Sequence, residues 1–78
     1  MRSDLVTDVE RPWVELVGKV GVIGVRDELL ARGITSPAFA AGIAVWLDDQ
    51  RSRRRHLSAP TVSGYRRALE RIRPPIPG

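Results

Sequence analysis

The stretch SPAFAAGIAVWLDDQR, residues 36–51, contains the clearest helix signal in the chain. Ser36 is a residue type that caps helix N-termini, and Pro37 suits the first helical position because the amide it lacks would have no partner there. Apolar side chains then recur with the spacing of one buried helical face, at Phe39, Ile43, Trp46 and Leu47. We therefore expect a helix from Ser36 to about Arg51 with its apolar stripe in the core.

A second helix is predicted directly before this one, in VRDELLARG, residues 25–33. Asp27 and Glu28 fall in its first turn, where negative charge interacts favourably with the helix dipole. Gly33 is the residue type that most often closes a helix, because it adopts a left-handed backbone at low cost. A turn between Gly33 and Ser36 is expected.

The sequence leaves open the conformation of residues 17–25, which precede this helix. Pro12 suits the first turn of a helix through Trp13. Three glycines then interrupt the pattern, and each costs up to about 1 kcal/mol relative to alanine inside a helix. The valines and isoleucine between them favour extended structure. We expect a short strand or a broken helix as alternatives to a continuous helix. The order of the glycines differs from that of a phosphate-binding loop.

The last helix is expected to begin at Ser58 or Ala59 and to stop by Arg73, because two prolines follow. Its apolar stripe is predicted at Val62, Tyr65, Leu69 and Ile72. Together these elements predict a mainly α-helical fold, a small bundle of three to four helices. We expect three segments along the chain: a flexible arm at 1–11, one helical domain at 12–73 and an extended tail at 74–78.

Size and composition exclude several kinds of protein. A chain of 78 residues forms one small domain that buries about 60 to 65 per cent of its unfolded surface. It has no cysteine, and the lone His56 cannot build a zinc site, so no disulfide, metal or cofactor is expected. Apolar residues make up 42% and charged residues 28% of the chain, as in ordinary folded domains. The fold must therefore depend on apolar packing or on a partner subunit.

The chain carries no recognisable carboxylate pair, metal cluster or nucleophile with its base, so we expect neither an enzyme nor a small-molecule ligand. Its first ten residues are acidic and lack the apolar core of a secretory signal. The longest apolar run is far short of the roughly 18 residues that cross a bilayer. A cytoplasmic protein with no membrane partner is predicted.

Positive charge is concentrated in the second half of the chain. Residues 45–78 carry eight arginines and three acidic residues, whereas residues 1–44 carry five basic and six acidic residues. One group of arginines precedes the last helix, and a second lies within it and at its end. Cations at a helix C-terminus are favourable by themselves, by about 0.3–1 kcal/mol each, and a GC-rich genome also favours arginine. Two clusters on either side of one turn nevertheless indicate an anionic partner such as a phosphate backbone.

Two family resemblances involve the same residues. LSAPTVSGY, residues 57–65, resembles the turn and recognition-helix start of helix-turn-helix repressors of the lac repressor family. That motif would place Arg51 and Arg55 at buried positions, where charge carries a large desolvation penalty. Residues 40–72, with WLDDQ followed by LSAPTVSGYRRALERI, are similar to the start of the core-binding, SAM-like domain of tyrosine recombinases and phage integrases. This second resemblance implies a helical DNA clamp, in which Tyr65 is a packing residue and not a nucleophile.

From these patterns we predict a small DNA-binding protein, a regulatory or recombination-accessory factor of a phage or mobile element. Its partner would be double-stranded DNA, and a homodimer is expected because single small modules bind weakly. The residues expected to face the groove are Thr61, Ser63 and Arg66, and those expected to hold phosphates are Arg53, Arg54, Arg55 and Arg67. The alternative is a helical protein-interaction or virion-structural protein whose arginines bind an acidic partner.

Overall fold

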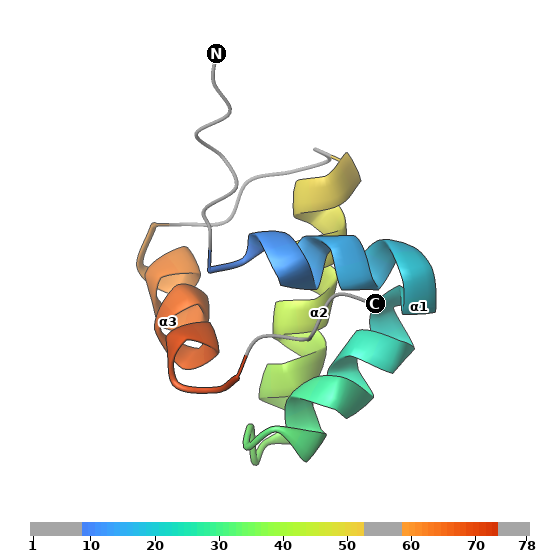
Figure 1. The fold of residues 1–78 in the computed structure, drawn as a ribbon. Coiled ribbons are helices and arrows are strands. Elements are labelled where there is room, and N and C mark those ends of the chain that lie inside the picture. The colour runs from blue at the N-terminus through green and yellow to red at the C-terminus, as the bar shows by residue number, and fades with distance from the viewer. Residues whose placement is uncertain (1–8, 53–58, 74–78) are drawn as a thin grey trace.

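The computed structural model describes residues 9–52 and 59–73, and these form three α-helices (Figure 1). Helix α1 spans Arg11–Ala31, α2 spans Pro37–Ser52 and α3 spans Ala59–Glu70. The described part of the chain contains no strand. The prediction of a mainly α-helical bundle of three to four helices is confirmed.

Helix α1 is bent at Gly21. Its backbone has φ 79° and ψ 177°, outside the helical region, and only glycine adopts this conformation at low cost. The two halves of α1 consequently run in different directions in Figure 1. Of the three conformations considered for residues 17–25, the broken helix is confirmed, and the strand and the continuous helix are wrong. Pro12 lies in the first turn of α1, as its lack of an amide proton favours.

The turn after α1 is closed by Gly33, as predicted. Gly33 has a φ of 126°, and its amide donates to the Leu30 carbonyl at 3.3 Å. The amide of Ile34 reaches back to the Leu29 carbonyl at 3.0 Å, which completes the paired hydrogen bonds of a Schellman ending. These bonds satisfy carbonyls that the end of a helix otherwise leaves without a partner. They also direct the chain towards α2.

Helix α2 begins as its sequence predicts. Ser36 caps it, because the Phe39 amide donates to Ser36 Oγ at 3.2 Å. Three members of the predicted stripe are buried, namely Ile43, Trp46 and Leu47. The predicted burial of Phe39 is wrong, because this residue is 39% exposed. Phe39 lies in the first turn of α2, at the edge of the core.

The core is built mainly by α1 and α2. Its buried apolar residues are Trp13, Val17, Val25 and Leu29 of α1, Ala40, Ile43, Ala44, Trp46 and Leu47 of α2, and Leu69 of α3. Both tryptophans are core residues, and neither is exposed for base stacking. Among the residues of α3 whose burial is described, Leu69 is buried and Val62 and Tyr65 are partly buried against the same core. Ile72, just after the helix, also packs there. The predicted stripe of α3 therefore faces inwards, and the rest of this helix is left outside the core.

Tyr65 of α3 packs against α2. The Tyr65 ring lies with its centroid 5.5 Å from that of Phe39 and 5.5 Å from that of Trp46. A Cβ atom placed on Gly42 would be only 2.8 Å from the Tyr65 hydroxyl oxygen. Glycine at position 42 thus allows the tyrosine to lie against α2.

The domain includes residues that the sequence assigned to the arm. Glu10 is fully buried, and Val9 packs against the core. Residues 9–11 therefore belong to the folded domain, and the expected boundary of the arm at residue 11 is wrong. The rest of the expected arm, residues 1–8, and the expected tail, residues 74–78, lie outside the described residues.

Candidate nucleic-acid interface

One face of α3 is turned away from the core. Burial follows the helical period: Leu69 is buried, whereas the exposed positions are Pro60, Ser63, Gly64, Arg67, Glu70 and, just after the helix, Arg71. Ser63, Arg67 and Arg71 are four residues apart in succession and so lie along one line on this surface. We call these six positions the outer face of α3.

The two arginines of this face are available to an external anion. No ion pair joins Arg67 or Arg71 to an acidic side chain within the described residues, whereas Arg26, Arg32 and Arg66 each have one. Arg67 and Arg71 lie about one turn apart, since the helix has 3.6 residues per turn. Glu70 is the one acid on the outer face, so its net charge is positive.

Arg66 points in a different direction from the one predicted. Its Nε donates to Glu10 Oε1 at 2.8 Å, and its side chain is 34% exposed while Glu10 is fully buried. The orientation follows from helical spacing, because Arg66 is three residues before the buried Leu69 and so lies on the same side of α3. The expectation that Arg66 faces outwards is therefore wrong in its geometry. Arg66 holds α3 against the domain.

Glu10 joins three parts of the fold. Gln50 near the end of α2 donates through Nε2 to Glu10 Oε2 at 2.7 Å, while Arg66 of α3 donates to Oε1. We call these three residues the Glu10 cluster. A buried carboxylate is tolerated only with such donors, because it has lost its hydration. Glu10 and Gln50 were not among the predicted residues, and no local pattern reveals them, since Gln50 and Arg66 are 40 and 56 residues from Glu10.

The other predicted contact residues are placed as follows. Ser63 and Arg67 are exposed on the outer face, and Thr61 is half-buried at its side. Arg53, Arg54 and Arg55 lie outside the described residues. The structure thus brings Ser63 and Arg67 to one surface and separates Arg66 from them.

The charge run that follows α2 begins at the surface. Arg51 and Ser52 form the last helical positions of α2, and both are exposed. Arg51 lies across α1, because a Cβ placed on Gly18 would be 2.8 Å from Arg51 Nε. The repressor-type motif would require Arg51 to be buried, whereas Arg51 is exposed in this fold.

Two further features of the described residues concern other classes of site. No helix among them combines the length and the apolar character needed to cross a membrane. Within residues 9–52 and 59–73, no three Asp, Glu or His side chains gather closely enough to hold a metal ion.

Comparison of the chain with protein-family models, curated proteins and solved structures gives no match. The two family resemblances stay predictions.

Proposed function

We propose that this chain is a small DNA-binding protein that contacts duplex DNA with the outer face of α3. The observation that carries the proposal is the pair Arg67 and Arg71, which lie about one turn apart on that face with no acidic partner among the described residues. An α-helix about 10–12 Å across fits the major groove, which is about 12 Å wide. The helix is also free of the core on this side.

The structure suggests a division of roles that differs from the predicted one. Ser63 and Arg67, at the middle of the outer face, are suited to base edges, since hydroxyl and guanidinium groups hydrogen-bond there. Arg71, at the end of α3, is suited to phosphate. Arg66 supports the helix through the Glu10 cluster. Phosphate contacts are also expected from Arg53, Arg54 and Arg55, which precede α3 in the sequence.

The biological role follows from resemblance alone. A regulatory or recombination-accessory factor of a phage or mobile element is the role that the similarity to recombinase core-binding domains favours. A homodimer is expected, because two linked half-sites supply the affinity that one small module lacks. Mass measurement of the protein with and without duplex would test this expectation.

A salt titration of duplex binding tests the proposed function. We expect fluorescence anisotropy of a labelled random duplex to report binding at low salt, with log affinity falling against log salt at a slope of about −3.6 if four phosphates are contacted. The double variant R67A/R71A should weaken binding and make that slope shallower by about 0.9, because Arg71 is the one of the two assigned to a phosphate. The matched control K19A/R26A removes two positive charges from α1 and should leave the slope unchanged. No affinity at low salt, or equal slopes for the two double variants, would contradict the proposal.

A second candidate function is supported by the exposed apolar side chains of α1. Val20 and Ile23 flank the bend at Gly21 and are 49% and 66% exposed. Large exposed apolar groups are common where another protein binds. A helical interaction protein with an acidic partner would form a complex of defined mass and ignore DNA. The anisotropy titration distinguishes this candidate from the proposed function.

A further inference from the structure

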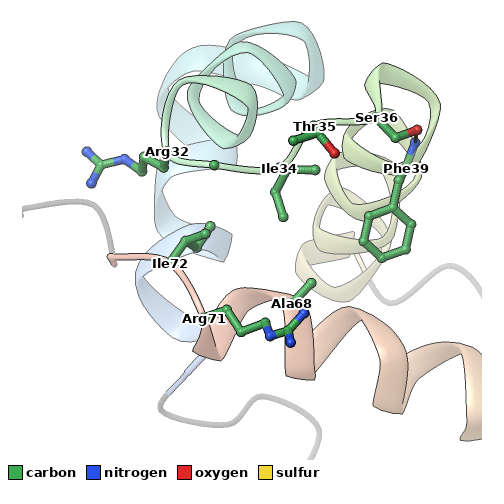
Figure 2. A pocket seen from close by; sticks show the side chains of 9 residues that line it. Arg32, Ile34, Thr35, Ser36, Phe39, Ala68, Arg71 and Ile72 are labelled. Carbon is green, nitrogen blue, oxygen red and sulfur yellow. Dashed lines mark hydrogen bonds between the residues drawn. The ribbon is translucent and has the colours of Figure 1, made fainter.

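A hollow of about 320 Å³ lies where the loop between α1 and α2 meets the C-terminal end of α3 (Figure 2). Its apolar walls are formed by Ile34, Phe39, Ala68 and Ile72. Thr35 and Ser36 contribute hydroxyl groups on the side of the α1–α2 loop, and Arg71 contributes a guanidinium on the side of α3. The hollow therefore combines an apolar interior with polar groups on opposite sides.

Arg71 is the cation available to an occupant of this hollow. Arg32 also lines it, but in Figure 2 its guanidinium points away. Arg32 donates through Nε to Glu28 at 2.6 Å and through Nη1 to the Arg73 carbonyl at 3.4 Å. The Arg71 side chain instead runs alongside Ala68 (Figure 2). Arg71 belongs both to the hollow and to the outer face of α3.

The shape and chemistry of the hollow indicate which part of a nucleic acid it can bind. Base pairs stacked within a duplex cannot enter a hollow in a protein surface, so an occupant must protrude from the helix. A phosphate protrudes, but it gains nothing from apolar walls. An unpaired base has two apolar faces and a polar edge, and aromatic side chains such as Phe39 beside a cation are typical of single-strand sites. The 39% exposure of Phe39 leaves part of its ring open to such a base.

We infer that the hollow binds an unpaired base next to the duplex held by α3. Its phosphate would lie on Arg71, its faces against Phe39 and the aliphatic walls, and its edge near the hydroxyls of Thr35 and Ser36. This inference rests on the proposed function, because Arg71 connects the two surfaces. The preferred substrate is then a junction of duplex and single strand, such as an overhang, gap or nick with a displaced base.

A comparison of overhangs with equal charge tests this inference. One duplex carries three unpaired thymidines at one end, and the matched duplex carries three abasic residues, so that both have the same number of phosphates. We expect the thymidine duplex to bind at least about fivefold more tightly, the lower end of what one stacked base contributes. Equal affinities would overturn the inference while leaving the proposed function intact. Absence of binding to a blunt duplex as well would overturn both.

Two variants test whether the preference for thymidine arises from this hollow. A68Q extends a side chain into the hollow without removing any positive charge, and it should abolish the preference for thymidine while leaving blunt-duplex affinity unchanged. F39A removes the aromatic wall and should also abolish the preference, measured as the ratio of thymidine-duplex to blunt-duplex affinity, because Phe39 also contacts Tyr65 of α3. Thermal melting checks that each variant folds. A thymidine preference that survives in folded A68Q and F39A would place the base elsewhere and overturn the assignment to this hollow. A hollow that instead binds a side chain of a protein partner would give equal affinities in the first comparison.

Discussion

Replacing Arg66 by alanine should separate the stability of the fold from its capacity to bind DNA. Arg66 donates its Nε to the buried carboxylate of Glu10, whereas its neighbour Arg67 is exposed. The two arginines are adjacent in sequence and equal in charge. R66A and R67A therefore form a matched pair: each removes one positive charge, but only R66A removes a partner of the buried Glu10 carboxylate.

The expected magnitude follows from the geometry of the pair. Loss of a hydrogen bond to a charged group costs about 1.5–3 kcal/mol, and removal of one partner from a fully buried pair costs about 3–5 kcal/mol. Because Arg66 is 34% exposed and Glu10 retains the Gln50 donor, we expect about 2–3 kcal/mol for R66A. A domain of this size has a free energy of unfolding of roughly 4–12 kcal/mol. R66A should thus lower the melting temperature by roughly 10–20 °C, because 1 kcal/mol corresponds to about 4–8 °C at this length.

Thermal melting followed by circular dichroism at 222 nm measures this difference. R67A should melt within a few degrees of the unchanged protein, since surface substitutions usually change stability by less than about 0.5 kcal/mol. At a temperature where both variants are folded, R67A should lose more DNA affinity than R66A. Equal melting temperatures for R66A and R67A would refute the assigned role of the Glu10 cluster. A double-mutant cycle of E10Q with R66M should give a coupling energy of about 1.5–3 kcal/mol.

Two further predictions concern glycines. G21A should destabilise the protein by about 1–3 kcal/mol, because a Cβ there has room but the backbone at φ 79° and ψ 177° suits only glycine. G64A, on the exposed surface of α3, should instead stabilise the protein by up to about 1 kcal/mol. Urea titrations in which G21A and G64A shift the unfolding midpoint in the same direction would contradict the bend in α1. G42A should destabilise by about 1–2 kcal/mol, since its Cβ would lie 2.8 Å from the Tyr65 hydroxyl oxygen and the ring must move. Adding Y65F should recover much of that loss by removing the oxygen, and additive effects in the same titrations would show that the contact does not hold α3 on α2.

Local signals in the sequence were sufficient to predict three of the helix ends. The Ser36 cap with Pro37, the closing Gly33 and the end of α3 before two prolines each depend on residues within one turn of the boundary. The apolar stripe of α3 was predicted for the same reason, because its side chains recur along one helix. The concentration of arginine in the second half is a property of composition, and it needed no fold to be recognised.

The direction of particular side chains was decided by the tertiary structure. Glu10 was assigned to a loose arm, and Arg66 to an outward face, because each was considered without its partner. Phe39 was assigned to the core because its spacing fits the stripe, although the edge of the bundle leaves it partly exposed. Around Gly21, the glycines of the sequence indicated that a regular helix was disfavoured, and the tertiary structure decided that the segment is a bent helix and not a strand.

The sequence by itself thus determined the turn after α1, the start of α2, the end of α3 and where the charge is concentrated, since these depend on neighbouring residues and on composition. Only the tertiary structure decided which arginines face outwards, because that choice depends on a buried carboxylate 56 residues away from Arg66. The outer face of α3 and the hollow beside Arg71 likewise exist only once the three helices are packed together. Burial and charge pairing act between residues that are close in space, and the linear sequence does not contain those distances.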